Sequence, residues 1–147
     1  MNIRTVKIRI GIVLSPEGGA LKKIAQPVRW GVGAPLGTGK QFMSWIHIED
    51  LCKMFIQAVE NESMHGAYNA VTPSPATNKE VTKAIAKALH RSLLLPPVPG
   101  FVLKLMLGEM ADLVLYGSKV SAAKIQQTGF TYTYADLEKA TNSFYKK

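Results

Sequence analysis

Apolar and polar residues alternate near the start of the chain and then change to helical spacing. The even positions from Val6 to Leu14 are apolar, and the run becomes continuously apolar at its end. This pattern predicts a strand that enters a covered sheet. A Ser-Pro-Glu-Gly-Gly turn at 15–19 follows. The next segment, 20–30, has the spacing of a short helix, which Pro27 weakens.

A second strand and a second helix are predicted further along the chain. The apolar run 41–48 has the character of a strand, and Asp50 lies just after it. Asp is a good helix N-cap, so we expect Asp50 to cap a helix over 51–61. The residues of this helix that we expect to face inward are Leu51, Phe55, Ala58 and Val59.

The same alternation of strand and helix then repeats. A short strand is predicted at 66–71, and Thr77 with Glu80 fits a capping box at the start of a helix. The buried stripe of that helix is expected to contain Val81, Ala84, Ile85, Ala88 and Leu89. The prolines of 93–100 predict extended backbone. Beyond them, helical spacing covers 101–116, a helix capped by Ser121 and ended by Gly129, and a last helix that opens at 133–136.

These elements indicate an α/β protein, or α+β if the chain is taken in isolation, with a helical C-terminal subdomain. The chain has 147 residues, which is enough to bury a core. No window holds the roughly 18 apolar residues that a membrane span needs, so we expect no membrane partner. The formal net charge is +8, but the basic residues are spread out and aromatic residues do not interleave them. We therefore expect no binding of nucleic acid.

The single cysteine, Cys52, allows no internal disulfide and fits a reducing compartment, so we expect a cytoplasmic protein. Because it lies within a helical pattern beside Leu51 and Phe55, we expect it to be a small buried hydrophobic residue and not a reactive thiol.

The glycine-rich segment 31–41 has the composition of a phosphate-binding loop but not its spacing. A P-loop needs four residues between its first glycine and the Gly-Lys pair, followed by Ser or Thr. Here Gly33 is one residue too far away, and Gln41 follows Lys40. The segment also follows a helical pattern and precedes a strand, which is the reverse of the dinucleotide-binding order. We interpret it as a structural loop or the rim of a substrate site.

No catalytic or metal-binding constellation is recognisable in the chain. The three histidines are isolated from any second ligand at metal-binding spacing. His47 lies in an apolar strand, where a hydrogen-bonded structural histidine is more common than a general base. Glu49 and Asp50 are adjacent, so their side chains point in different directions. We therefore predict no catalytic residue, no cofactor-binding residue and no metal ligand within this chain.

Several segments taken together resemble the C-terminal half of extended short-chain dehydrogenases, the NAD(P)-dependent sugar epimerase/dehydratase family. The segments with this resemblance are Arg9-Ile-Gly-Ile-Val-Leu-Ser-Pro16, Trp45-Ile-His-Ile-Glu-Asp-Leu51, Gly66-Ala-Tyr-Asn69 and Gly129-Phe130 with Leu137. Three more resemble an atypical subgroup with a C-terminal domain of unknown function, namely Gly18-Gly19-Ala20, the run 31–43 and Leu107-Gly-Glu-Met-Ala-Asp112. The resemblance implies that 1–96 holds the last strands of a Rossmann-type sheet and part of the substrate domain. It implies that 97–147 is the helical subdomain.

The elements that would make such a protein an enzyme are absent from this sequence. The family opens with a strand and Gly-x-x-Gly-x-x-Gly, and it uses a Tyr-x-x-x-Lys pair for proton transfer. Neither spacing occurs here, since Lys119 lies three residues after Tyr116 and Lys139 lies five after Tyr134. We therefore expect NAD(P) to serve a full-length protein and no cofactor to bind this chain alone.

The resemblance also implies a set of substrate-binding residues. They are Arg9, Lys40, Gln41, Trp45 and His47, with the loops 31–43 and 96–101 lining the cleft. Two positions depart from the nucleotide-sugar pattern, because Ile12 stands where the family has a substrate-binding Asn and Met43 where it has an Arg. A diphosphate would lack its polar and cationic partners there, which favours a less charged substrate than a UDP-sugar, or no substrate.

Two functions remain open at this stage. The first is the substrate-binding half of an NAD(P)-dependent, nucleoside-sugar-epimerase-like oxidoreductase or epimerase, inactive as this fragment. The second is a non-enzymatic protein-interaction module on the same scaffold. The partners implied are a small-molecule substrate in the full-length protein and the missing Rossmann half. Because the neighbours of the strand from Val6 to Leu14 would come from that half, we expect either self-association through this strand or a rearranged packing that covers it with the chain's own helices.

Overall fold

Three pairs of short strands and a set of helices make up the structure, a computed structural model that describes residues 3–109, 112 and 115–145. Two of the strand pairs are parallel and one is antiparallel. The strands are β1 (Val6–Ile10) with β5 (Gly66–Ala70), β2 (Ile12–Leu14) with β4 (Trp45–His47), and β3 (Phe42–Met43) with β6 (Ala76–Thr77).

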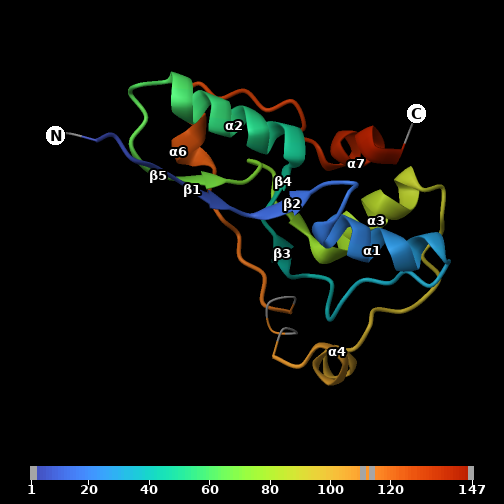
Figure 1. Cartoon of the computed structure of the whole chain (residues 1–147). Helices are drawn as coiled ribbons and strands as arrows, with labels where there is room; N and C mark the ends of the chain where they lie inside the picture. The colour runs from blue at the N-terminus through green and yellow to red at the C-terminus, as the bar shows by residue number, and fades with distance from the viewer. Residues whose placement is uncertain (1–2, 110–111, 113–114, 146–147) are drawn as a thin grey trace.

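The helices surround these strands on several sides (Figure 1). Their bounds are α1 Gly19–Arg29, α2 Ile48–Glu60, α3 Asn78–Ala88, α4 Gly100–Leu107, α6 Ala123–Gln126 and α7 Leu137–Tyr145. Helix α2 lies along the β1–β5 pair, α7 contacts α3, and α4 projects at the lower end of the molecule. Mixed strands and helices with helices at the C-terminus confirm the predicted fold class. Part of the helix predicted over 101–116 lies outside the described residues.

Gly11 lies between β1 and β2, which follow each other along one extended segment. The first part of this segment pairs with β5 and the second part pairs with β4. The Gly11 N–H donates to Ala70 O at 3.1 Å, and the next N–H, of Ile12, donates to Ser44 O at 2.8 Å. A Cβ at Gly11 would lie 2.4 Å from Ser44 O and 2.7 Å from Val71 Cγ1. Only glycine therefore fits at the point where β4 meets β1, β2 and the end of β5.

The core consists of two hydrophobic clusters on either side of β4. Successive strand residues point to opposite faces, and accordingly Ile46 packs with α2 and β5 whereas Trp45 packs with α1 and α3. Both side chains are fully buried. The first cluster also contains Met54 and Tyr68. The strand β4 thus contributes one side chain to each cluster.

Helix α2 differs from its prediction in both its start and its buried face. It begins at Ile48, and the N-cap is His47, so the prediction that Asp50 caps the helix is wrong. The side chains that face inward are those of Asp50, Leu51, Met54 and Ala58. Two faces of this helix are apolar, and hydrophobic spacing alone could not decide which of them is buried.

The residues on the outer face of α2 correct two further expectations. Phe55 is 46% exposed and Val59 is 75% exposed, although both were expected to face inward. Cys52 is exposed as well, so the expectation of a buried cysteine is wrong. The outer face of α2 therefore carries an apolar stripe that the described part of the chain leaves uncovered.

Local signals near the other helices agree better with the structure. The Thr77–Glu80 capping box is present at the start of α3, and all but one of the five residues predicted for its buried stripe are buried. The exception, Leu89, is half-buried and packs against the second cluster. The prediction that Ser121 caps a helix ended by Gly129 is wrong, because the N-cap of α6 is Ala122 and its C-cap is Gln127. Ser121 Oγ accepts from Ala123 N, and Gly129 has a positive φ of 79° beyond that helix. Asp136 accepts from Lys139 N at the start of α7.

Candidate functional site

The glycine-rich loop before β3 wraps around the N-terminus of α3. The N–H of Asn78 donates to Gln41 O, and the N–H of Lys79 donates to Gly39 O, each at 3.0 Å. Asn78 Oδ1 in turn accepts from Leu36 N at 2.7 Å. The first N–H groups of α3, which an anion would need, are therefore already bonded to the loop's own carbonyls. This geometry agrees with a structural or rim loop and not with a phosphate cradle.

A second loop runs alongside the first. Leu36 and Val98 form an isolated bridge, in which Gly37 N donates to Val98 O at 2.9 Å and Val98 N donates to Pro35 O at 2.8 Å. The two loops expected to line the substrate cleft, 31–43 and 96–101, are thus joined through their backbones. They form one rim, which continues into the projecting helix α4 (Figure 1).

The five residues predicted to bind substrate lie on three different elements. Arg9 is exposed on β1, Lys40 is exposed in the loop before β3, and Gln41 is half-buried beside it. Trp45 and His47 lie on β4 and are buried. The Gln41 Nε2 donates to Leu36 O at 2.8 Å, and the Trp45 Nε1 donates to Ser74 O at 3.2 Å.

His47 is enclosed by the C-terminal segment. Its ring stacks on Tyr134 at 3.8 Å and on Phe144 at 4.5 Å between centroids. The Nδ1 atom accepts from Glu49 N, so Nε2 carries the proton and faces Ser143 Oγ at 3.0 Å. Burial lowers the pKa of His47, against the opposing influence of Glu49 and Asp50. The ring is therefore neutral, and the structure agrees with a structural histidine.

Asp50 makes the second connection between α2 and the C-terminal segment. Its side chain is fully buried, and its two carboxylate oxygens accept from Thr133 N and Tyr134 N at 2.8 Å each. Charge-assisted hydrogen bonds of this kind satisfy a buried carboxylate. The His-x-x-Asp pair at 47 and 50 therefore anchors the segment around Tyr134 and α7 onto the end of β4.

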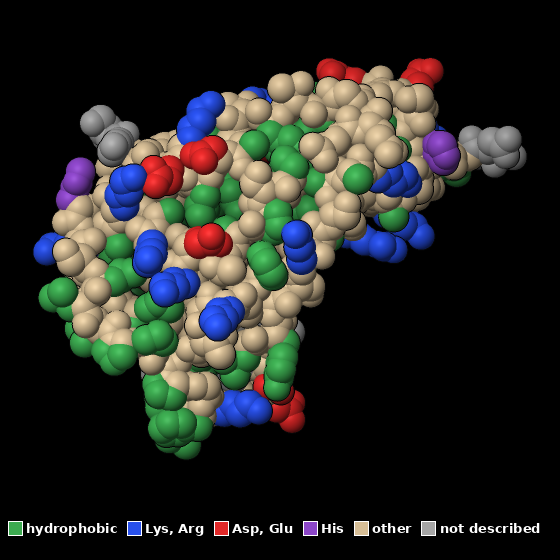
Figure 2. Space-filling model, turned by 180° about the vertical axis from the view of Figure 1, so that it is seen from behind, with side chains coloured by type: hydrophobic (Ala, Val, Ile, Leu, Met, Phe, Trp, Pro, Cys, Tyr) green, Lys and Arg blue, Asp and Glu red, His purple; other side chains and the backbone are tan. Residues whose placement is uncertain are grey.

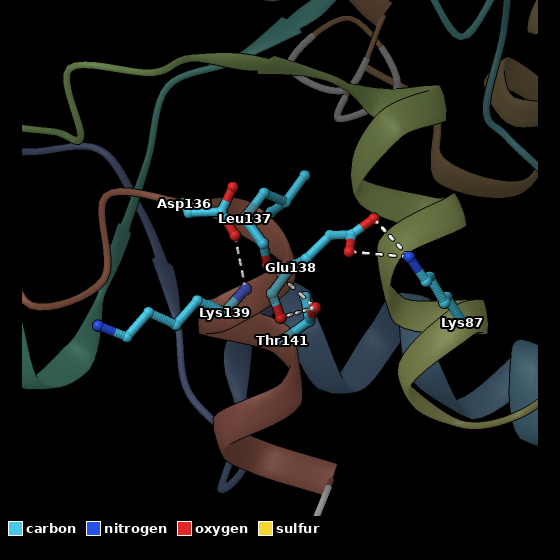
Figure 3. A network of polar contacts seen from close by, with 6 residues as sticks. All are labelled: Lys87, Asp136, Leu137, Glu138, Lys139 and Thr141. Carbon is cyan, nitrogen blue, oxygen red and sulfur yellow. Dashed lines mark hydrogen bonds and ion pairs between the residues drawn. The ribbon is translucent and has the colours of Figure 1, made fainter.

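An open groove of about 660 Å³ lies between α3 and the start of α7. Its polar lining consists of Ser74, Glu80, Lys83, Lys87, Asp136 and Glu138. Lys87 Nζ lies 2.8 Å from Glu138 Oε2, and both side chains are exposed (Figure 3). An exposed ion pair contributes little, so the apolar contact between α3 and α7 holds this groove together. Side chains of both charge signs lie interspersed with hydrophobic ones on the rear face (Figure 2).

The two positions that depart from the nucleotide-sugar pattern are packed into the protein. Ile12 packs against the second core cluster, and Met43 is buried with its Sδ accepting from Asn78 Nδ2 at 3.7 Å. Neither position can present a polar group to a diphosphate.

Two residues that connect distant segments, Asn78 at the rim and Ser44 at the segment 118–120, were not found by the sequence reasoning. Asn78 holds Leu36, and Ser44 Oγ donates to Ser118 O at 2.6 Å and accepts from Val120 N at 2.9 Å. No local pattern marks either residue, because each acts on a segment far away in the chain. Within the part of the chain that the structure describes, no three His, Cys, Asp or Glu side chains gather as a metal site would require. None of the described helices has the length and apolarity to cross a membrane.

This chain is similar to the C-terminal part of proteins named as epimerase family proteins. Residues 98–143 match a family described as a domain of unknown function, DUF1731. The chain is 43% identical over 138 residues to the epimerase family protein YfhF of Bacillus subtilis, covering 94% of this chain and 45% of that protein. It is 38% identical over 135 residues to the human epimerase family protein SDR39U1, covering 91% of this chain and 46% of that protein.

Solved structures give the same result. The crystal structure of human SDR39U1 (isoform 2) with NADPH matches with a TM-score of 0.92 and 36% identity, over 98% of this chain and 49% of that one. A nucleoside-diphosphate sugar epimerase from Corynebacterium glutamicum matches with a TM-score of 0.73 and 25% identity, over 98% of this chain and 27% of that one. The chain therefore corresponds to the C-terminal part of epimerase family proteins, and it spans about half the length of the curated relatives it matches. The predicted resemblance is confirmed.

Proposed function

We propose that this chain is the substrate-binding C-terminal half of an NAD(P)-dependent, epimerase-like oxidoreductase and is inactive by itself. The observation behind this proposal is the match to a relative whose structure was solved with NADPH. The match extends over 98% of this chain but only 49% of that relative. The matched part supplies the rim loops and the helical subdomain. The single cysteine fits a reducing, cytoplasmic setting for the whole protein.

The residues present do not form a site for the dinucleotide. No described strand is followed by a Gly-x-x-Gly-x-x-Gly turn and a helix, and the one glycine-rich loop has its carbonyls bonded to α3. NAD(P) would supply the hydride chemistry once bound by the other half. The role of this chain is then to hold the substrate against that half, with Arg9, Lys40 and Gln41 as the candidates that reach the surface.

The substrate we propose is less charged than a nucleotide sugar. The apolar, half-buried Ile12 and the buried Met43 support this choice, because a diphosphate needs cationic or hydrogen-bonding partners at such positions. Trp45 and His47 would then contribute to the site by fixing the strand and helix beside it.

Calorimetric titration of the isolated chain with NADPH and NADH tests the proposal, with full-length YfhF as the comparison protein. We expect no saturable heat from the isolated chain. Micromolar affinity of the isolated chain for either nucleotide would contradict it.

A second candidate function rests on the exposed apolar surface of α4. Phe101 is 74% exposed and Leu105 is 87% exposed on α4, the helix labelled at the lower end of the molecule in Figure 1. Such a surface favours a non-enzymatic interaction module on the same scaffold. A folded monomer that gains no nucleotide binding when joined to a nucleotide-binding half would favour this second function.

A further inference from the structure

His47 is the N-cap of α2 and also the residue that attaches the end of α7 to β4. Its ring is 1% exposed, although histidine titrates near neutral pH. Tyr134, which precedes α7, and Phe144, near the end of α7, both stack on this ring. One imidazole therefore holds the start of one helix and the end of another.

The hydrogen bonds around this ring leave room for one proton only. Ser143 Oγ donates its single proton to Ala140 O at 2.6 Å, so it can only accept from His47 Nε2, 3.0 Å away. On the other side of the ring, Nδ1 accepts from the Glu49 N–H at 3.1 Å. A second proton would have to bind to Nδ1, where two buried N–H groups would then face each other without an acceptor. The imidazolium form therefore does not fit this arrangement.

We propose that the contacts of His47 with Tyr134, Ser143 and Phe144 form an acid-sensitive latch. A proton on His47 Nδ1 releases the last turn of α7 from β4, while α2 and the strands stay folded. This inference is independent of the proposed function, because every contact of the latch lies within this chain.

The charged groups of α2 act on His47 in opposite directions. Burial has the largest influence and lowers the pKa of the ring, and Lys53 acts in the same direction. Glu49 and Asp50 raise this pKa, but by less than burial lowers it. The carboxylate of Asp50 is bound by two backbone N–H groups, so it is not available to the Nδ1 proton. The neutral ring is therefore the form that the closed latch holds.

The C-terminal side of the latch offers the proton no acceptor either. The charged groups beside its rings are Lys139, over the ring of Tyr134, and Arg29, over the ring of Tyr145. Both are cations. The hydroxyl of Tyr145 stays protonated, because burial raises its pKa. A charged His47 ring can thus satisfy its second N–H only by leaving its place and reaching water.

Only the end of α7 depends on the latch. The segment before this helix is held separately, because Asp50 accepts from Tyr134 N. Thr141, near the middle of α7, is fully buried. Phe144 and Tyr145 are partly buried against the second core cluster. Opening of the latch therefore frees the last turn of α7 and uncovers this edge of the cluster, while the rest of the chain stays packed.

Amide hydrogen exchange of this chain at pH 7.5 and pH 5.5 tests the latch. A released ring takes up a proton with the ordinary pKa of 6.5, so the open fraction should rise about tenfold between these two pH values. The protection factors of the Phe144 and Tyr145 amides, corrected for the pH dependence of exchange itself, should fall by the same factor. At pH 5.5 these two protection factors should not change in urea up to about 1 M, whereas that of the Met54 amide in the core should fall, because only global opening exposes much surface.

Two variants separate the proton from the packing. His47→Asn keeps an N-cap acceptor but cannot titrate, so the protection factor of the Phe144 amide should no longer depend on pH. Ser143→Ala removes the acceptor of Nε2–H, which the neutral and the charged ring both carry. This variant should lower the protection several-fold at both pH values and keep the tenfold difference between them. His65→Gln, at an exposed histidine, is the matched control and should change neither.

Three results would overturn the proposal. A Phe144 amide with the same protection at both pH values would show that the end of α7 does not respond to a proton. A pH difference that persists in His47→Asn would assign the proton to another group. Equal urea dependence of the Phe144 and Met54 amides would show that the end of α7 opens only when the whole chain unfolds.

A measurement on the unchanged chain decides the proposal if His47→Asn does not fold. The NMR shifts of the His47 ring report its charge directly. We expect the closed chain to show a neutral ring at pH 5.5. A ring that is charged at pH 5.5 while the Phe144 amide keeps its full protection would contradict the latch, because the closed arrangement would then hold an imidazolium.

Discussion

The buried carboxylate of Asp50 accepts a 2.8 Å hydrogen bond from the backbone N–H of Tyr134, a residue 84 positions further along the chain. The other carboxylate oxygen bonds Thr133 N in the same way. One side chain on α2 thus fixes the approach of the C-terminal segment, and Tyr134 can then stack on His47. Asp50 therefore holds two distant segments together, whereas the sequence analysis predicted that it caps a helix.

Replacing this carboxylate by its amide should therefore be costly. In Asp50→Asn the side-chain oxygen can accept from only one of the two backbone N–H groups, and the side-chain NH₂ group faces the other N–H. This change should lower the free energy of unfolding by about 1–3 kcal/mol. Urea unfolding checks this value. Asp136→Asn is the control, because Asp136 is an exposed helix cap and Asn caps a helix about equally well. Equal stability of the two variants would show that Asp50 is not an anchor.

The buried ring of His47 should make stability depend on pH. Its folded pKa lies below the ordinary value of 6.5 because burial disfavours the charged form. Below pH 6.5 the unfolded state therefore binds more protons than the folded state, and stability falls as the pH falls toward the folded pKa. Above pH 6.5 this contribution is fully present.

Urea unfolding between pH 5 and pH 7.5 measures this effect. His47→Asn keeps an N-cap acceptor but cannot titrate, so this variant should lose the part of the slope that His47 contributes. His65→Gln should keep it, because His65 is exposed on a different segment. An unchanged slope in His47→Asn would assign the pH dependence to other groups.

The close approach at Gly11 predicts a sharp size limit. Gly11→Ala places a Cβ 2.4 Å from Ser44 O, and the resulting shift of β4 should cost about 1–3 kcal/mol. Gly100→Ala provides the control, because its nearest neighbour is Leu115 Cδ1 at an ordinary 3.6 Å. Thermal unfolding of the two variants should separate them clearly, and similar melting temperatures would contradict the tight junction.

Local features of the fold could be predicted from the sequence, but long-range ones could not. The Thr77–Glu80 capping box and the buried stripe of α3 depend on neighbours within a few residues, and both agree with the structure. The buried face of α2 was predicted wrongly because the apolar pattern also runs through Phe55 and Val59, which the structure leaves exposed. The anchoring role of Asp50 depends on Tyr134, and no local pattern joins the two residues.

In the candidate site, too, local features could be predicted from the sequence and long-range contacts could not. The mismatch of the glycine-rich loop to a phosphate cradle could be read from spacing alone, and the bonds from Lys79 N to Gly39 O and from Asn78 N to Gln41 O give its physical reason. The joining of this loop to Val98 depends on backbone pairing between distant segments, which no residue type signals. The binding of substrate by Arg9 and Lys40 stays a prediction.

The central claim is that this chain completes a nucleotide-dependent protein only together with another half. The most direct measurement is NADPH binding by the isolated chain and by a fusion in which the preceding part of YfhF is joined to this chain. The account predicts no saturable binding by the isolated chain and micromolar binding by the fusion. Equal binding by both, or binding by neither when full-length YfhF binds NADPH under the same conditions, would contradict it.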